Sequence, residues 1–363
     1  MPFMFSQNDA AMSKPLKVGE DREIMPLTKV CFEFYQGFKL AADSLAKAGL
    51  NVQIIIIDTK NDSNEVKRQL ANQNELDLIV GPLYEKCIDV TSRYAKENGI
   101  NMVIPFKNNT ENLKNNEHVF ATVTSNMTLF DGVVDYVVAQ HYMHKVIVMK
   151  PQYGDMTIYD RVRERYNEKI KAMPNAYSTQ IVDVDMGSSS GRDLNLFIAK
   201  DSVNIVIVPS VDVKIVSGAL NRLNKVMNMN HRAKNMKIIV FGIEEWNNLA
   251  DLDILHKVRL NHHYATYRHT NLNAGRGLKM LRSFRSKFGI DPSVYAVQGF
   301  DVGLYFLSAL QLYGTNFQHY LAQHKIALVQ NKFDFKQITT GSGYENQGIK
   351  IVRFAGYQLV ELQ

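Results

Sequence analysis

The sequence contains few of the features that mark a disulfide-rich domain, a zinc protein or a membrane protein. Only two cysteines occur among 363 residues, Cys31 and Cys87, and their separation fits no zinc-binding pattern. Both fall in expected helices, so buried free thiols are favoured over a disulfide. No apolar run approaches the roughly 20 residues of a membrane-spanning helix. The sequence therefore predicts neither a bound metal nor a membrane span in this chain.

Motifs of catalysis and of nucleic-acid binding are also lacking. There is no Gly-x-Ser-x-Gly, no His-Glu-x-x-His and no recognisable nucleophilic cysteine motif. Lys and Arg are spread along the chain, and no DNA-reading helix pair precedes the expected lobes. The formal net charge of +6 permits an anionic ligand without requiring one. We expect a non-enzymatic protein with no cofactor and no nucleic-acid partner, although an enzyme remains an alternative because catalytic triads are spatial arrangements.

The chain begins with an alternating series of strands and helices. The apolar run Leu78 to Val80 ends abruptly in Gly81-Pro82 and precedes a helical pattern, which is half of a βαβ unit. Similar units surround it. The expected elements here are a strand tail at 1–5, a polar loop at 6–29, a helix at 30–48, a strand at 52–57, a helix from Ser63, strands at 78–80 and 102–104, and a helix at 85–97.

A second alternating series follows an extended crossing at residues 119–124. A third set of elements, mostly helical, follows another polar crossing near 269–276, and the chain ends in a hairpin turning at Gly356-Tyr357. The expected strands are at 145–149, 179–184, 203–208, 236–241, 260–264, 333–335, 349–354 and 358–361, and the expected helices are at 159–170, 193–199, 213–227, 278–288, 295–312 and 317–325.

This order of elements predicts an α/β protein with two Rossmann-like lobes. Sequential βα units favour parallel sheets with right-handed crossovers, and a chain of this length is expected to form more than one core. Lobe 1 is expected to contain residues 1–122 plus 268–332, and lobe 2 residues 123–267 plus 333–363. Several crossings would join the lobes in a multi-strand hinge. Ligands of open α/β sheets lie beyond the carboxyl ends of the strands, so an inter-lobe cleft is the predicted site.

Several short motifs occur in a characteristic order: Phe34–Ala41, Asp58-Thr59 with Asn61-Asp62, Ile79–Pro82, Ile104-Pro105, Ala296–Leu310, and Phe333–Phe335 followed by Gly341 and Asn346. This order resembles the type I periplasmic binding proteins, in particular the leucine/isoleucine/valine-binding branch. The resemblance covers nearly the whole chain and implies the fold more strongly than the ligand. The chain is also similar to the binding-protein-like domains of LysM-type, peptidoglycan-associated envelope proteins.

The resemblance implies that turns after two strands of lobe 1 hold the ligand. In amino-acid binders of this family these turns carry Ser or Thr, which are absent here, and this departure weakens the expectation of an amino-acid ligand. Lys107 is a candidate anion anchor that would replace the missing hydroxyls, or else a solvated lysine. Tyr84 and Phe106 would either enclose a ligand or pack between the lobes. The candidate binding residues of lobe 1 are Leu83, Tyr84, Phe106, Lys107 and Asn108.

Candidates in the second lobe also follow expected strands. Gln152 and Tyr153 follow one strand, and Ser210 follows another at a helix start, where a hydroxyl also serves as a cap. In the family an acidic residue after a second-lobe strand pairs with a ligand amine, and Glu244 or Glu245 stands near that place. The helix dipole alone also favours a glutamate there. Asp301 is a further candidate ligand residue, with backbone bonding at the hinge as the alternative.

The resemblance implies a binding domain of the periplasm or cell envelope that closes on a small polar ligand, such as an amino acid, a peptide or a cell-wall fragment. The alternative is a degenerate cleft whose outer surface contacts envelope proteins. Met1 to Phe5 lacks the basic leader and apolar core of a signal peptide, so we expect any export signal and any peptidoglycan-binding region to lie in a preceding segment.

Overall fold

The computed structural model describes residues 1–13, 24–108, 110–174, 181–186, 191–249, 252–356 and 358–362. Contacts divide the chain into two compact units, each built from more than one segment. Unit 1 comprises Met1–Thr124 and Thr270–Gly348, and unit 2 comprises Ser125–His269 and Ile349–Gln363. The chain therefore passes between the units three times, after Thr124, His269 and Gly348.

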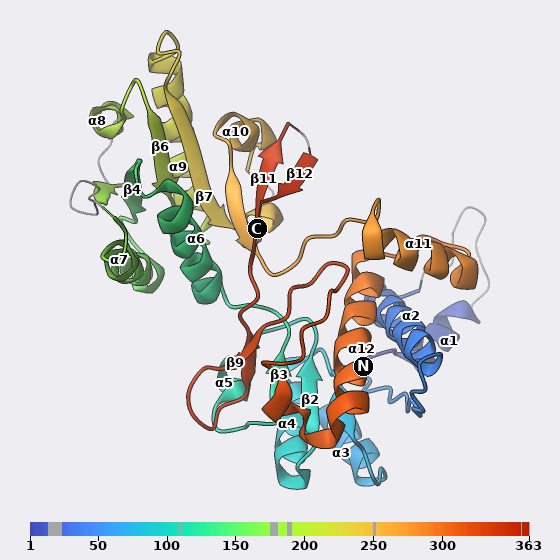
Figure 1. Cartoon of the computed structure of the whole chain (residues 1–363). Helices are drawn as coiled ribbons and strands as arrows, with labels where there is room; N and C mark the ends of the chain where they lie inside the picture. The colour runs from blue at the N-terminus through green and yellow to red at the C-terminus, as the bar shows by residue number, and fades with distance from the viewer. Residues whose placement is uncertain are drawn as a thin grey trace. The chain divides into compact units, whose positions relative to one another are not determined.

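Unit 1 contains a five-stranded sheet in the order β1-β2-β3-β10-β9. Figure 1 labels β2, β3 and β9 of this sheet. Strands β1, β2, β3 and β10 run parallel, and β9 runs antiparallel to β10. Residues 333–348, which the sequence placed in lobe 2, thus add β9 and β10 to this first sheet. The elements of unit 1 are α1 (Phe5–Met12), α2 (Pro26–Ala46), α3 (Ser63–Ala71), β1 (Leu78–Val80), α4 (Glu85–Asn98), β2 (Asn101–Ile104), α5 (Thr110–Leu113), β3 (Val119–Ala121), α11 (Gly275–Phe288), α12 (Val294–Tyr313), the 3₁₀ helix η3 (Gly314–Tyr320), β9 (Phe335–Gln337) and β10 (Tyr344–Asn346).

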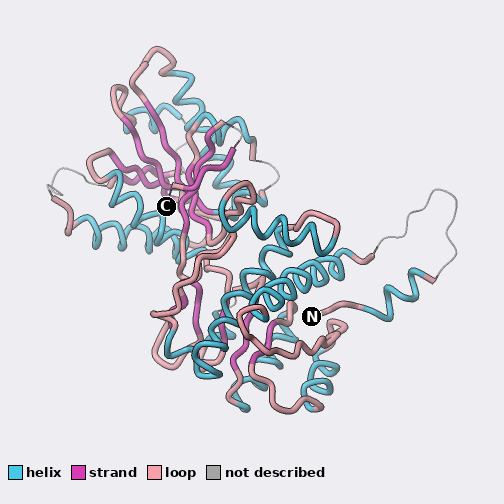
Figure 2. The backbone as a smooth tube through the Cα atoms, turned by 45° about the vertical axis from the view of Figure 1, so that its right-hand side comes forward, coloured by secondary structure: helices cyan, strands magenta, loops and turns pink. Residues whose placement is uncertain are grey.

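Two long helices of unit 1, α2 and α12, cross at unusually short range and lie side by side in Figures 1 and 2. Glycines at the crossing allow this approach. A Cβ placed on Gly299 would lie 1.9 Å from the backbone oxygen of Phe34, and one on Gly37 would lie 1.8 Å from that of Ala296. The resemblance to binding proteins included these two helices, and the structure shows why their glycines are needed.

Two expected strands near the start of the chain are not formed, and these predictions are wrong. Residues 52–57 have no strand pairing, and Phe5 begins helix α1. The nitrogen of Met1 donates to the oxygen of Ile57, and the nitrogen of Thr59 donates to the oxygen of Met1. Two bonds do not make a ladder, and Ile55 and Ile56 remain exposed. The expected loop at 6–29 contains α1 and the start of α2, and its residues 14–23 lie outside the described residues.

Unit 2 contains a seven-stranded sheet in the order β12-β11-β8-β7-β6-β4-β5. Strands β5, β4, β6, β7 and β8 are parallel, and β11 and β12 add antiparallel partners at one edge. The elements are α6 (Asn126–His141), β4 (Lys145–Lys150), α7 (Thr157–Ile170), β5 (Val182–Asp185), α8 (Gly191–Phe197), β6 (Val203–Ile207), α9 (Val213–Met229), β7 (Lys237–Ile243), the 3₁₀ helix η2 (Glu244–Asn248), α10 (Ile254–Arg259), β8 (His263–Thr266), β11 (Lys350–Ala355) and β12 (Gln358–Glu361).

The core of unit 2 follows from the apolar runs of its central strands. Every residue of β6 after its first is buried, and β4 is buried between its two terminal lysines. Such runs are typical of parallel strands covered by helices on both faces. The predicted mixed α/β fold with two parallel-dominated sheets is therefore confirmed.

Candidate functional site

The carboxyl ends of β1 and β2 lie next to each other in unit 1 because the two strands pair in parallel. After β1, Gly81 has a φ of +93°, a conformation that favours glycine, and its nitrogen donates to the oxygen of Val103 in β2. The peptide bond between Gly81 and Pro82 is cis. This turn places Leu83 and Tyr84 directly before α4, with Tyr84 as its N-terminal flanking residue.

Three of the predicted residues of unit 1 come together in one apolar cluster. Leu83 is buried with Phe3 and Cys31, and the half-buried rings of Tyr84 and Phe106 pack against this group. Phe106 also makes an edge contact with Phe34, at 5.2 Å between ring centroids, and another with Tyr295, at 5.9 Å. The strand ends of unit 1 thus present an aromatic surface whose outer part is Tyr295, which is 36% exposed.

Polar groups follow directly after Phe106. Lys107 is exposed and forms no ion pair with the described residues. The Nδ2 atom of Asn108 donates to a carboxylate oxygen of Glu345 on β10 at 2.9 Å. Its Oδ1 atom is buried and has no hydrogen-bond partner within the described part of the chain. Buried acceptors are normally paired, so the unpaired Oδ1 atom of Asn108 is an exception among the described residues at these strand ends.

The predicted residues of unit 2 gather at one edge of its sheet, because β4, β6 and β7 are parallel neighbours. Gln152 and Tyr153 follow β4 and are exposed. Ser210 follows β6 and is buried, and its backbone oxygen accepts a hydrogen bond from the indole nitrogen of Trp246 at 2.9 Å. The expectation that Ser210 caps the next helix is wrong. Asp212 caps α9, with bonds from two backbone nitrogens, and the Ser210 hydroxyl instead accepts from the nitrogen of Asp212.

Glu244 follows β7 and already has a cationic partner. One carboxylate oxygen accepts from the Nε atom of Arg268 at 2.9 Å, and the other accepts from the hydroxyl of Thr266 at 2.5 Å. The Thr266 hydroxyl also bonds the backbone of Arg268. The negative charge of Glu244 is therefore balanced by Arg268 within unit 2, next to the end of β8. Sequence reasoning missed Arg268 because it lies 24 residues from Glu244.

Asp301 lies inside α12 and is fully buried. Its carboxylate accepts hydrogen bonds from the backbone nitrogens of Val329, Gln330 and Asn331 and from the Asn331 side chain. Burial raises the pKa of Asp301, and these hydrogen bonds oppose the rise. The carboxylate is thus engaged within unit 1, where it fixes the segment after η3.

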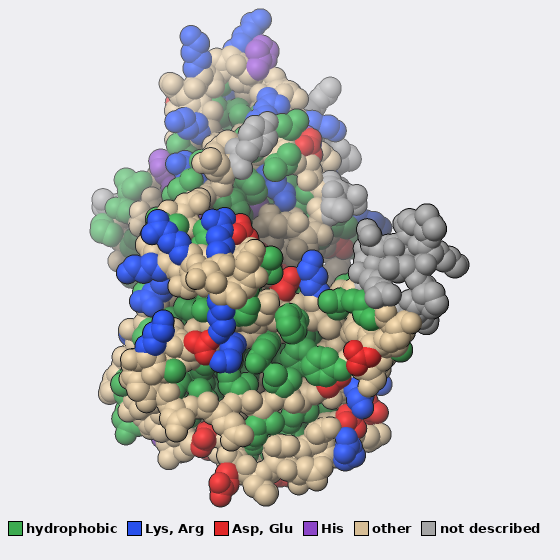
Figure 3. All heavy atoms as spheres, turned by 90° about the vertical axis from the view of Figure 1, so that its right-hand side faces the viewer, with side chains coloured by type: hydrophobic (Ala, Val, Ile, Leu, Met, Phe, Trp, Pro, Cys, Tyr) green, Lys and Arg blue, Asp and Glu red, His purple; other side chains and the backbone are tan. Residues whose placement is uncertain are grey.

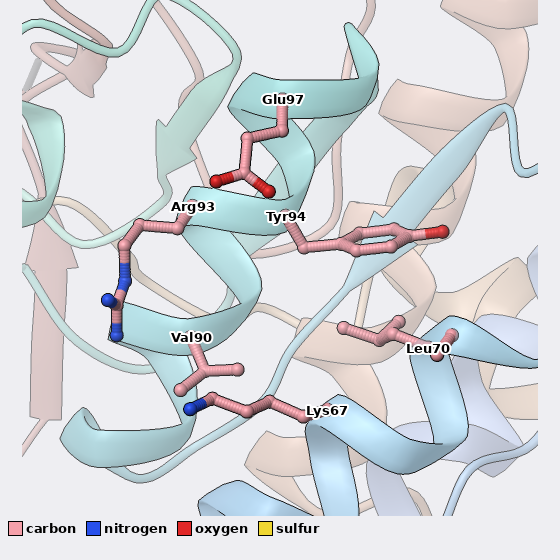
Figure 4. A pocket seen from close by; sticks show the side chains of 7 residues that line it. Lys67, Leu70, Val90, Arg93, Tyr94 and Glu97 are labelled. Atoms are coloured by element: carbon pink, nitrogen blue, oxygen red, sulfur yellow. The ribbon is translucent and has the colours of Figure 1, made fainter.

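A surface groove between α3 and α4 has a volume of about 260 Å³ and contains none of the predicted residues (Figure 4). Its apolar floor is formed by Leu70 and Val90, and Lys67, Arg93 and Glu97 are exposed around it. The groove lies at the later turns of α4, whereas the strand-end residues precede the first turn. It therefore does not belong to the candidate site.

The described residues contain no group of three or more His, Cys, Asp or Glu that could hold a metal ion. In the same part of the chain, no helix is long and apolar enough to cross a membrane. Cys31 and Cys87 are buried free thiols, as predicted, and burial raises the pKa of Cys31 to about 11. Sequence reasoning missed three residues that contact predicted ones: Tyr295 contacts Phe106, Arg268 contacts Glu244 and Glu345 contacts Asn108. Only Tyr295, in an expected helix start, carried any signal in the sequence.

Comparison with solved structures identifies the fold, whereas no protein-family model and no curated protein matches the chain. A putative branched-chain amino acid ABC transporter protein from Rhodospirillum rubrum matches with a TM-score of 0.66 and 12% identity, covering 93% of this chain and 96% of that one. A substrate-binding protein from Desulfitobacterium hafniense in complex with Leu matches at 0.56 and 14%, covering 91% and 95%. A branched-chain amino acid periplasmic ligand-binding protein from Burkholderia xenovorans matches at 0.55 and 14%, covering 92% and 90%. The chain therefore has the two-unit α/β fold of the ABC-transporter substrate-binding proteins.

Proposed function

We propose that this chain is a non-enzymatic binding domain that closes its two units on a small polar ligand with an apolar or aromatic part. The observation that carries the proposal is the strand-end surface of unit 1, where Phe106 contacts Tyr295 and where, two residues later, the Oδ1 atom of Asn108 has no hydrogen-bond partner among the described residues. A partly exposed aromatic surface is suited to a ligand that has an apolar body, and a small shift that uncovers the Asn108 oxygen would add an acceptor for a ligand donor.

The charges at the strand ends refine the ligand class. Lys107 offers an exposed cation in unit 1, whereas the carboxylate of Glu244 in unit 2 is already neutralised by Arg268. A ligand amine would have to compete with that guanidinium. The Desulfitobacterium neighbour is described in complex with Leu. We infer an amino acid, a peptide or a cell-wall fragment whose carboxylate faces Lys107, and a ligand amine bound by groups other than Glu244.

Ligand screening by thermal unfolding tests this proposal. Amino acids, short peptides and muropeptides are added to the full chain, and at least one is expected to raise the unfolding temperature, because a ligand that binds only the folded state stabilises it. Asn108→Ala and Lys107→Ala should each weaken binding about fivefold to tenfold. Lys96→Ala, at another exposed lysine of unit 1, is the matched control. Equal weakening by the control, or no stabilisation by any compound, contradicts the proposal.

We further propose a location in the periplasm or cell envelope. Substrate-binding folds of this kind occur in the ABC-transporter proteins that the chain resembles. The similarity to LysM-type envelope proteins stays a prediction, as does contact with peptidoglycan through a preceding region. Fractionation of cells that express the full-length gene product tests the location, and its recovery in the cytoplasm would contradict it.

A second candidate function is a protein-interaction module with a degenerate site. One observation favours it: Phe106 is held between Phe34 and Tyr295, so the chain's own rings already fill part of the strand-end surface. In that case no small molecule would stabilise the chain. Cross-linking in intact cells would instead recover a defined envelope protein, and Tyr295→Ala would abolish the cross-link.

A further inference from the structure

Helix α11 in unit 1 carries five cationic residues and no acidic residue in 14 positions. The sequence shows no run of Lys or Arg, because apolar residues separate these cations. In the structure Gly277, Met280, Leu281 and Phe284 are the buried residues of this helix, and the cations are exposed. Lys and Arg side chains gather on the face drawn in Figure 3, which is the side where Figure 1 shows α11. The cationic residues are Arg276, Lys279, Arg282, Arg285 and Lys287.

Few carboxylates compensate this charge. Arg285 pairs with Asp291, and Lys287 pairs with Asp43, which also pairs with Lys39 of α2. Arg276, Lys279 and Arg282 form no ion pair within the described ranges. The described set of Lys39, the five cations of α11 and their two carboxylate partners has a net charge of +4.

The stability of the helix does not explain this arrangement. Positive side chains near a helix N-terminus oppose the helix dipole, and Arg276 and Lys279 lie in the first five residues of α11. Helix α4 in the same unit also has 14 residues and three cations, but Glu85, Asp89 and Glu97 alternate with them. The exposed face of α4 thus mixes acidic and basic side chains, whereas α11 has only basic ones. This difference indicates that the unbalanced charge of α11 serves binding.

We propose that the exposed face of α11 docks on a membrane surface that contains anionic phospholipids. Between its cations the face carries the polar residues Ser283 and Ser286, with no exposed aromatic anchor. A protein interface would need a desolvated aromatic or apolar centre, and a single-stranded nucleic-acid site would need rings for stacking. Dispersed cations suit the delocalised negative potential of lipid headgroups, which attracts each Lys or Arg near the surface.

Vesicle binding tests the proposal with the full chain. Sedimentation with phosphatidylcholine vesicles that contain phosphatidylglycerol is compared with sedimentation with phosphatidylcholine alone. The triple variant Arg276→Gln, Lys279→Gln, Arg282→Gln should bind the anionic vesicles about a hundredfold more weakly, at about fivefold for each cation. The matched control is Lys86→Gln, Arg93→Gln, Lys96→Gln on α4, which removes the same charge from a helix of equal length and should bind as the parent does.

Every outcome decides the question. The proposal is supported if the chain binds anionic vesicles, if the α11 triple variant but not the α4 triple variant loses this binding, and if salt weakens it. Equal loss in the two triple variants shows an effect of net charge and overturns it, as does binding to neutral vesicles. Competition by glycerophosphate at the lipid concentration would show a site for single phosphate groups and would overturn the proposal. Binding of RNA or of an acidic protein through α11, without binding to vesicles, would show another partner and would also overturn it. Circular dichroism checks that both variants retain the parent unfolding temperature, and a third variant, Lys279→Gln alone, keeps the test valid if a triple variant unfolds.

Discussion

The two units hold the ends of their connecting segments by different chemistry. In unit 1, neutral side-chain amides hold these segments. Gln298 donates to the backbone oxygen of Pro105 and to the Thr122 hydroxyl. The side-chain oxygen of Gln298 accepts from the side chains of Gln330 and Asn331. All of these side chains are buried. In unit 2, charged groups that are partly exposed do it, with Glu244 bound to Arg268. Neutral buried bonds are insensitive to salt and pH, whereas partly exposed ion pairs are screened.

The unit 1 network reaches all three passages between the units. Thr122 lies just before the first passage, Thr270 after the second bonds Gln330, and Asn346 before the third bonds the backbone of Thr122. The Thr124 hydroxyl donates to the oxygen of Asn346. Unit 1 is therefore expected to hold the near ends of these segments rigidly, so that any bending takes place beyond them.

The largest expected effect comes from Asp301, a fully buried carboxylate of unit 1 that accepts a hydrogen bond from the side chain of Asn331 in this network. Asp301→Ala leaves three backbone nitrogens of residues 329–331 without their acceptor, and we expect the free energy of unfolding to fall by about 3 to 5 kcal/mol. Chemical denaturation followed by circular dichroism measures the loss. Asp291→Ala, at an exposed aspartate of the same unit, is the control, and a loss no greater than that control would refute the rigid role of this segment.

The next effect concerns two buried histidines, one in each unit. His262 of unit 2 stacks on Trp246 at 4.9 Å, and both of its ring nitrogens lack hydrogen-bond partners among the described residues. His324 of unit 1 contacts the oxygen of Tyr305 and the hydroxyl of Ser308. His262→Phe should stabilise unit 2 by about 1 to 3 kcal/mol, because it removes unpaired polar atoms, whereas His324→Phe should destabilise unit 1. Fluorescence of the sole tryptophan, Trp246, reports unit 2, and destabilisation by His262→Phe would contradict the prediction.

The same histidine gives unit 2 an acid sensitivity. Burial lowers the pKa of His262 well below 6.5 and that of His141 to about 4. The unfolded chain binds a proton at each of these histidines more tightly than the folded chain does. The free energy of unfolding is therefore unaffected by them above pH 6.5. It falls as the pH drops from 6.5 toward the folded pKa values, by about 1.4 kcal/mol per pH unit for each histidine. Unfolding measured at pH 7 and pH 5 should show this loss, reduced in His262→Phe. An equal pH dependence in both proteins would exclude His262 as its source.

The ion pair between Glu244 and Arg268 in unit 2 should contribute less to the free energy of unfolding than Asp301 does in unit 1. Glu244→Gln keeps the acceptor for Thr266 but removes the charge that faces Arg268, and we expect a loss of about 1 kcal/mol that shrinks in high salt. Denaturation with urea at low and high salt measures it. The neutral counterpart in unit 1, Gln298→Leu, should cost the same at both salt concentrations, and salt dependence in that variant would break the contrast between the units.

The smallest effect tests the corrected helix cap. Asp212→Ala removes two bonds to backbone nitrogens of α9 and should cost about 1 kcal/mol. Ser210→Ala should cost less, because the Ser210 hydroxyl accepts from only one nitrogen, that of Asp212. Thermal unfolding followed by Trp246 fluorescence compares the two variants. A greater loss for Ser210→Ala would restore the original interpretation of that serine as the cap.

The sequence by itself determined most helices and the buried parallel strands, because their apolar periods are local. The long apolar patterns of α2 and α12 and the runs of β4 and β6 are examples. Tertiary structure decided the rest. The β-branched run at 52–57 found no ladder, β10 formed from an unpatterned segment, and Asn108, Glu244 and Asp301 obtained partners 22 to 237 residues away. Propensity is a property of neighbours along the chain, whereas hydrogen-bond partners and burial depend on which distant segments the fold brings together.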